Sequence, residues 1–451
     1  MPAVTGPGPG PRTAPLTYEQ EWYAANTRRS TRVPRNVRLS YRILGPLDPE
    51  LFEEAVRLFV ARHDALRMLP VPAPGAATAQ QVLAVDPADR PVLHRSVTAS
   101  SADQFSYYAA AVLSRDVITP LTGDQRPFTL RLLRHDAGHH AFLATFGNLF
   151  FDGRAHDLFT REVWQDYAAL RDTGEPAVPS APSFAEAARR QREGYGPRHL
   201  ERARASWHRR LEFAARHRWR ELDGVRRTAD GSVGARLPAA TVAALREHCR
   251  ATRCTVMHWL VGSFVRALAR EAGQPRLSLW TSVDSRRPAE RDVAGMFAGP
   301  APLAIADPAA ALPEVVAEVG HAMVDALRHQ QFTAGELAGL LDSPPGAEAG
   351  GAPLARDVYV NLRSFPGDHR PVRADGELRI TADAYPLRRI TFQDSSALHL
   401  RCDEYRDTVL LDLLFDGRRV GEPLARTIVD RVVADAAAVH RTTSASRKAL
   451  P

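Results

Sequence analysis

Apolar residues recur every three or four positions in four stretches of the chain, a spacing that predicts amphipathic helices. The first helix is expected within LDPELFEEAVRLFVARHDAL at 47–66, where Asp48 can cap the helix and Pro49 fits its first turn. Similar patterns occupy 157–170, 255–273 and 423–439. Each pattern presents one apolar face, so these helices are expected to pack on a common core.

Short runs of β-branched, aromatic and other apolar residues predict strands. They lie at 128–133, 140–146, 276–283, 357–365, 378–383, 397–402 and 408–415. Helical and strand patterns alternate in both halves of the chain. The expected fold class is therefore mixed α/β, of the α+β type.

The chain has 451 residues, which is long for one hydrophobic core and favours two domains. The Pro-, Ala- and Ser-rich stretch 171–183 is the best linker. We expect an N-terminal domain at 15–175, and a linker with a C-terminal domain at 176–446. Residues 1–14 are Pro/Gly-rich and are expected to be a disordered tail, with a second tail at 447–451; a flexible loop is expected near 342–353.

The charge pattern argues against nucleic acid as a partner. The net charge is +7, and the only lysine is Lys448, so arginine carries almost all the positive charge. The arginines are interspersed with acidic residues rather than gathered with aromatic residues, as a nucleic-acid footprint requires. No apolar run reaches the length of about 18 residues that spans a bilayer.

Three cysteines, Cys249, Cys254 and Cys402, are too few and too unpaired for a disulfide framework. They favour a reducing compartment, and we expect a cytoplasmic protein. His248 and His258 flank the first two cysteines, but their spacing does not match a standard zinc site. No bound metal is therefore expected.

The most informative junction reads FGNLFFDGRAHDLF at 146–159. An apolar strand breaks at Gly147, Asp152-Gly153 turns the chain, and an amphipathic helix follows. Loops held on rigid elements often carry functional residues. This loop lacks a side chain that transfers protons near neutral pH, because Asn148 can only donate and accept hydrogen bonds.

Five further stretches carry recognisable motifs: LTYEQEWY at 16–23, RHDALRML at 62–69, SWHRRL at 206–211, SVDSRRPAERDVAGMFAGP at 282–300 and ALRHQQF at 326–332. With these motifs in this order, the chain resembles the condensation domains of nonribosomal peptide synthetases, which are relatives of chloramphenicol acetyltransferase. The resemblance covers roughly residues 15–440. Each match is weak alone, but their common order is fairly specific.

The family signature is His-His-x-x-x-Asp-Gly, and in this register the chain reads Gly147-Asn148-x-x-x-Asp152-Gly153. Both histidines are absent, and Asn148 replaces the one linked with catalysis. The resemblance marks Asn148, Asp152 and Gly153 as candidate catalytic positions. It also implies that Asp152 shapes the loop by pairing with Arg286, and that Gly147 and Arg286 support the site.

Three other histidines lie near this loop in the sequence. His156 follows the Asp-Gly closely and is the candidate alternative base, although a capping or surface role fits it better. His139 and His140 precede the strand and are expected to be surface residues of a turn.

By resemblance, the fold is two chloramphenicol-acetyltransferase-like subdomains arranged as a V, with the site at their seam. In the family, phosphopantetheine arms of acyl- or peptidyl-carrier proteins enter this seam. The chain is thus expected to need no cofactor of its own. Because no adenylation or carrier segment is evident, it is expected to act as a free-standing partner of carrier proteins in natural-product, such as antibiotic, biosynthesis.

Two functions fit this pattern. The first is transfer of an acyl or peptidyl group from a carrier thioester to an amine, which needs less base assistance than a hydroxyl acceptor. The second is a catalytically inactive module that docks carrier proteins or recruits a tailoring enzyme. A site blocked by Phe150 or Phe151 would favour the second, whereas the family resemblance favours the first.

Overall fold

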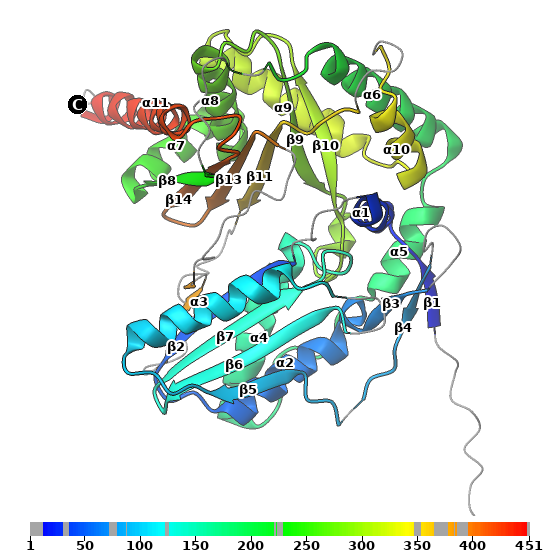
Figure 1. The fold of residues 1–451 in the computed structure, drawn as a ribbon, viewed down its shortest axis with the longest axis vertical. Coiled ribbons are helices and arrows are strands. Elements are labelled where there is room, and N and C mark those ends of the chain that lie inside the picture. The colour runs from blue at the N-terminus through cyan, green and yellow to red at the C-terminus, as the bar shows by residue number, and fades with distance from the viewer. Residues whose placement is uncertain are drawn as a thin grey trace, which may run out of the picture. The chain divides into compact units, whose positions relative to one another are not determined.

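The computed structural model describes residues 12–29, 36–71, 79–86, 88–121, 126–220, 222, 229–346, 353–364, 378–382, 384–385 and 396–448. Contacts group the chain into two compact units. The N-terminal unit comprises Met1–Gly196, Arg286–Ala298 and His369–Arg389, and the C-terminal unit comprises Pro197–Ser285, Gly299–Asp368 and Ile390–Pro451. Each unit combines helices with its own sheet (Figure 1), which confirms the mixed α/β class.

A five-stranded sheet forms the centre of the N-terminal unit, in the order β12-β2-β7-β6-β5. Its strands are β2 (Val37–Leu44), β5 (Val92–Ser96), β6 (Phe128–Asp136), β7 (His139–Phe146) and β12 (Arg379–Ala382). The central strand β7 runs antiparallel to both neighbours, and its last residue, Phe146, lies opposite Val37 and Phe128. All eight positions of β7 are buried, because helices cover both faces of the sheet.

Helix α3 (Ala102–Ile118) covers one face of this sheet, and helices α2 (Pro49–Arg62) and α4 (Gly153–Thr173) cover the other (Figure 1). Helix α2 begins as predicted, since the Asp48 carboxylate accepts hydrogen bonds from the Glu50 and Leu51 amides. It ends at Arg62, before the predicted end at residue 66. The next residues form a short 3-10 helix, η1 (Asp64–Arg67), because His63 takes an extended backbone conformation.

The predicted linker 171–183 joins α4 to α5 (Phe184–Glu193) inside the N-terminal unit. It is held there because Val178 donates its amide to Asp166 and accepts a hydrogen bond from Arg62. The contacts therefore group the linker with the N-terminal unit, and the two units divide after Gly196.

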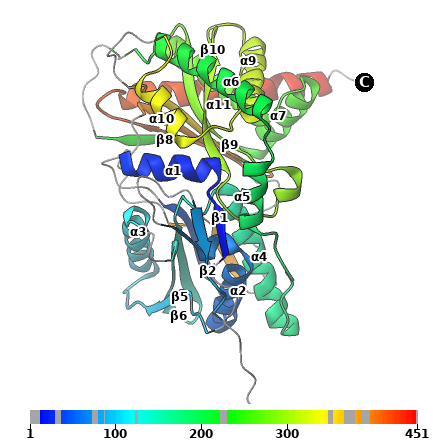
Figure 2. The same ribbon diagram turned by 90° about the vertical axis from the view of Figure 1, so that its right-hand side faces the viewer.

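A small sheet, β1-β4-β3, and helix α1 (Tyr18–Arg29) complete this unit. Strand β1 (Arg12–Pro15) lies beside α5 (Figure 2) and pairs with β4 (Ala79–Val82), which also pairs with β3 (Met68–Pro70). The predicted disordered tail 1–14 is therefore wrong for residues 12–14, whose backbone is paired. Residues 1–11 lie outside the described residues.

The C-terminal unit has a six-stranded sheet in the order β10-β9-β11-β13-β14-β8. Its strands are β8 (Gly231–Leu237), β9 (Leu277–Asp284), β10 (Ala298–Ile305), β11 (Val358–Ser364), β13 (Leu398–Glu404) and β14 (Val409–Phe415). Its helices are α6 (Pro197–Arg216), α7 (Ala239–Ala251), α8 (Val256–Glu271), α9 (Leu312–Arg328), α10 (Ala334–Asp342) and α11 (Glu422–Lys448). Apolar residues of α7, α8, α9 and α11 pack with the sheet in one large core. None of the helices in the described part of the chain is both long enough and apolar enough to cross a membrane.

Two segments that the sequence assigned to the C-terminal domain pack in the N-terminal unit instead. Strand β12 pairs antiparallel with β2, and residues 286–298, which include the 3-10 helix η2 (Pro288–Glu290), contact the loop before α4. These pairings join residues more than 100 positions apart, so local sequence patterns do not reveal them. Of the predicted loop 342–353, residues 347–352 lie outside the described residues, as do 449–451 of the C-terminal tail.

The expectation that His139 and His140 are surface residues is wrong. Both belong to β7 and are buried, because the hairpin turns earlier, where Asp136 accepts a hydrogen bond from the Gly138 amide. His139 packs on Phe105 with ring centroids 4.8 Å apart. Burial, with the nearby Arg134 guanidinium, lowers the pKa of His140 to about 4, so this imidazole is neutral at pH 7.

We expect His140 to make the fold sensitive to acid. An unfolded histidine has a pKa of about 6.5, so stability from neutral His140 is complete above pH 6.5 and is lost as pH falls toward 4. The full loss is about 3 kcal/mol. Urea denaturation of the wild type and His140→Phe at pH 7.5 and 4.5 measures it. The variant should lose less stability than the wild type, whereas His321→Gln, at an exposed position, should follow the wild type.

Candidate active site

The chain leaves β7 at Gly147 and reaches α4 at Gly153 through a tightly held loop. The Gly147 amide donates to the Pro127 carbonyl at 2.7 Å, and the Phe150 amide donates to the Gly147 carbonyl at 2.9 Å. Phe151 stacks on Phe146 with ring centroids 3.9 Å apart. The loop is thus anchored at its start, in its middle and at its end, while Asn148 is partly exposed.

Both phenylalanines of the loop are turned into the protein interior. Phe151 belongs to the core between the sheet and helices α2 and α4. Phe150 belongs to a second cluster with Phe184 and Phe297. Each side chain is more than nine-tenths buried. Neither phenylalanine is therefore free to cover Asn148, the arrangement that would have favoured an inactive module.

The Asp152 carboxylate is saturated with hydrogen-bond donors. It caps α4 by accepting from the Ala155 amide at 2.9 Å. Arg286 binds both of its oxygens, at 2.7 and 2.9 Å. The Phe297 amide donates to it at 2.9 Å. The pairing of Asp152 with Arg286 that the resemblance implied is present, and it joins residues 134 positions apart.

The Arg286 guanidinium also has several hydrogen-bond acceptors. Besides Asp152, its guanidinium donates to the carbonyls of Val293 and Gly295 at 3.1 and 3.2 Å, and it lies 4.3 Å from the centroid of the Phe297 ring. The side chains of Arg286 and Asp152 are only 3% and 2% exposed. A buried, bidentate and fully hydrogen-bonded ion pair fixes the conformation of the chain around it. Asp152 therefore shapes the loop, and a catalytic role for Asp152 or Asn148 stays a prediction.

The motif at 16–23 supports the loop from another side. Gln20 donates to the Leu149 carbonyl at 2.9 Å, next to Asn148, and to the Gln80 side chain at 2.8 Å. Thr17 donates to the Met296 carbonyl at 3.1 Å, next to the Phe297 amide that binds Asp152. The resemblance pointed to Gln20, but no sequence signal pointed to Gln80 or to the Phe297 amide. Backbone groups of distant residues leave no trace in the side-chain pattern.

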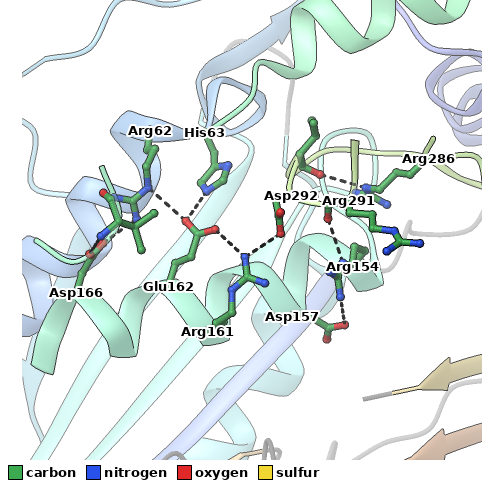
Figure 3. Close-up of polar contacts among 12 residues, drawn as sticks. Arg62, His63, Arg154, Asp157, Arg161, Glu162, Asp166, Arg286, Arg291 and Asp292 are labelled. Atoms are coloured by element: carbon green, nitrogen blue, oxygen red, sulfur yellow. Dashed lines mark hydrogen bonds and ion pairs between the residues drawn. The ribbon is translucent and has the colours of Figure 1, made fainter. Parts of the chain in front are cut away.

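Arg62 and His63 hold helix α4 through two of its acidic residues (Figure 3). Arg62 binds Asp166 at 2.7 Å and Glu162 at 3.3 Å, and His63 binds Glu162 at 2.9 Å. Burial alone would raise the pKa of Glu162, but His63 and Arg62 keep this pKa below its usual value.

The same network extends to the segment that carries Arg286. Arg161 lies 3.4 Å from Glu162 and 3.0 Å from Asp292 (Figure 3). Helix α4, whose first turn is capped by Asp152, is thereby tied to residues 286–298 at both its first and its third turn. The loop that holds Asn148 is therefore supported by the buried Asp152–Arg286 and Arg62–Asp166 pairs and by the exposed Arg161–Asp292 pair.

The remaining candidates lie around the start of α4. Gly153 is the first residue of the helix. His156 is buried in its first turn, and its Nδ1 atom lies 3.5 Å from the Asp157 carboxylate. A role for His156 as a base stays a prediction. Among the described residues, no group of three or more His, Cys, Asp and Glu side chains is placed to hold a metal ion.

Gly295 is a sensitive point in this framework. A Cβ atom there would collide with the ring of Phe184, and the Gly295 carbonyl accepts a hydrogen bond from Arg286. We expect Gly295→Ala to lower the free energy of unfolding by about 1–3 kcal/mol through overpacking. Gly335→Ala is the matched control, since nothing lies within 4 Å of its new methyl group. Equal urea midpoints for the two variants would contradict this account.

Comparison with known proteins identifies the family of this chain. The family model named "Condensation domain" matches residues 12–373. A curated relative, N-(5-amino-5-carboxypentanoyl)-L-cysteinyl-D-valine synthase of Penicillium rubens, is 26% identical over 367 residues, which cover 78% of this chain and 9% of the synthase. The chain thus spans about a tenth of the length of this relative.

Two solved structures share the fold. The first condensation domain of the calcium-dependent antibiotic synthetase, in complex with a substrate analogue, aligns with a TM-score of 0.72 and 20% identity, covering 95% of this chain and 96% of that one. The X-domain from teicoplanin biosynthesis, solved in complex with OxyB, aligns with a TM-score of 0.69 and 21% identity, covering 97% and 95%. The family match covers most of the chain, and the protein belongs to the condensation-domain family.

Proposed function

We propose that this protein transfers an acyl or peptidyl group from a carrier-protein thioester to an amine acceptor in nonribosomal peptide or related biosynthesis. The observation that carries this proposal is the intact Asp152–Arg286 clamp, which holds the loop in a defined shape and leaves Asn148 partly exposed. The clamp fixes the shape of the loop, and the match to the condensation-domain family supports acyl transfer as the chemistry that this shape serves.

The chemistry that suits Asn148 is amide formation. The amine nitrogen attacks the thioester carbonyl carbon, the carbon–sulfur bond breaks, and the proton lost by nitrogen ends on the released thiol. A neutral amine is already nucleophilic, so positioning by Asn148 and proximity can supply much of the rate. A carboxamide N–H can also donate a hydrogen bond to the oxygen that becomes negative during attack.

A hydroxyl acceptor presents a different requirement. It is a poor nucleophile when neutral, and base assistance is typically worth about 10²–10⁴ in rate. Asn148 cannot supply such assistance. We therefore infer that the acceptor is an amine and that ester formation is slow.

The reacting groups are delivered by partners rather than by a cofactor of this chain. We propose acyl- or peptidyl-carrier proteins as partners, whose phosphopantetheine arms carry the thioester. Affinity capture from the native lysate, followed by mass spectrometry of phosphopantetheine-bearing peptides, identifies the carrier and its acyl group.

Transfer is then measured with the captured carrier and paired acceptors that differ only in amine or hydroxyl. We expect amide formation to exceed ester formation at least tenfold, as base assistance on a hydroxyl is worth about 10² or more. Faster ester formation would overturn the choice of acceptor. No transfer to either acceptor from a cognate loaded carrier would overturn the enzymatic proposal.

The second candidate is a docking module without transfer activity. Two observations favour it: Asn148 occupies the position of the family histidine, and the chain shares its fold with an X-domain that was solved in complex with OxyB. On this proposal, capture would return a tailoring enzyme, with or without a carrier. Binding of that enzyme, together with absence of acyl transfer, would select this candidate.

A further inference from the structure

The motif RHDALR at 62–67 contains four charged or titratable side chains, and three of them have structural partners. Arg62 and His63 bind acidic residues of α4. Asp64 accepts hydrogen bonds from the Ser183 hydroxyl and the Phe184 amide at the start of α5. Arg67 takes no part in these contacts with α4 and α5.

The Arg67 guanidinium is half-buried, and its one hydrogen bond within the described residues is to the Leu83 carbonyl. No carboxylate of these residues forms an ion pair with it, and its Nε atom is buried without a partner. Burial lowers the pKa of Arg67, only partly offset by Asp64, yet the group stays charged at neutral pH. A half-buried cation without a counter-ion is costly unless something else supplies the negative charge.

Arg67 lines a cavity of about 160 Å³ between α2, η1, the segment after β4 and the start of β6. Its apolar wall includes Val60, Ala61, Leu66, Leu83 and Phe128. The loop residues 147–152 do not line it, so the cavity is distinct from the site around Asn148. An apolar body can fill this space while a charged end meets Arg67.

The other two arginines that line the cavity already have carboxylate partners. Arg57 forms an ion pair with Glu54 at 2.6 Å, and Arg126 pairs with Asp89. Asp86 accepts a hydrogen bond from the Ala88 amide at 2.8 Å. Arg67 is therefore the arginine of the lining that forms no ion pair among the described residues. A ligand with one negative charge would complement it.

We propose that this cavity binds a small monocarboxylate whose apolar body is about the size of a benzene ring. A cavity of about 150 Å³ lined by apolar residues is known to hold benzene. A planar carboxylate matches the fork of a guanidinium, which can donate to both of its oxygens. Phosphate or sulfate would leave oxygens against the apolar wall without hydrogen-bond partners.

The test uses the full chain and benzoate as the probe, with benzamide as the neutral isostere and acetate as a carboxylate without the ring. Isothermal titration measures binding up to about 20 mM, the range expected for a ligand of this size. We expect benzoate to bind at least tenfold more tightly than either comparison compound. Benzamide lacks the charge that strengthens the hydrogen bond with Arg67, and acetate lacks the ring that buries apolar surface in the cavity.

Two variants and a control keep the outcome decisive. Arg67→Gln removes the charge and Ala61→Leu fills the apolar wall, and each should weaken benzoate binding about tenfold or more. Arg115→Gln, an exposed position on α3, should bind as the wild type does. Thermal melts confirm that the variants fold. Failure of benzoate to bind, equal binding of benzamide, or unchanged binding by both cavity variants would overturn the proposal.

Discussion

Replacing Asp152 with alanine is expected to lower the free energy of unfolding by about 3–5 kcal/mol, the usual cost of leaving a buried charge unpaired. Arg286, whose side chain is 3% exposed, would lose both of its charged contacts. The Ala155 and Phe297 amides would lose their acceptor at the same time. Urea denaturation followed by tryptophan fluorescence measures the loss.

Two further variants test whether the cost comes from the uncompensated charge. Asp172→Ala removes an exposed ion pair with Arg171 and should leave the urea midpoint close to that of the wild type. The double variant Asp152→Ala/Arg286→Met should be more stable than Asp152→Ala alone, because the orphaned cation is gone. Leaving one buried polar group without a partner costs at least about 1 kcal/mol of folding free energy. A smaller loss of stability in Asp152→Ala would therefore contradict a clamp role.

Replacing Asn148 with histidine is expected to raise the rate of transfer to a hydroxyl acceptor by about 10²-fold, because an imidazole can take the proton that a carboxamide cannot. The gain for an amine acceptor should be smaller. With N148H the rate should fall as pH drops below about 6.5, where an ordinary imidazole becomes protonated and no longer acts as a base. Single-turnover assays with a loaded carrier at several pH values measure both effects.

The control for this gain is Asn148→Ala, which removes the hydrogen-bonding group without adding a base. It should transfer to an amine more slowly than the wild type and show no pH-dependent gain. If N148H folded normally but did not raise the transfer rate with either acceptor, residue 148 would not lie next to a reacting group. The docking role would then be favoured. Asp152 serves the fold in both cases, so its variant does not separate the two functions.

The sequence anticipated much of the local structure. The cap at Asp48, the end of the strand just before Gly147 and the helix after Asp152 are where the pattern of apolar and polar residues predicts them. The pairing of Asp152 with Arg286 came from the family resemblance, since no local rule connects residues 134 positions apart. The amides and glutamines that complete the site could not be predicted, because backbone donors look alike in every sequence.

By itself, the sequence determined the features that depend on near neighbours. These are the mixed α/β class, the capped start of α2, the loop at Gly147–Gly153 and the absence of an imidazole at Asn148. Helix capping and apolar spacing act within one or two turns, so short stretches suffice to specify them.

Only the tertiary structure decided the features that depend on distant partners. Strand β12 joins the N-terminal sheet by pairing with β2, and His140 becomes neutral because helices cover both faces of β7. Arg62 forms buried ion pairs whereas Arg67 faces a cavity, although the two lie in one short motif. Burial and charge pairing are set by which residues meet in the folded chain, and the physical role of a side chain follows from them.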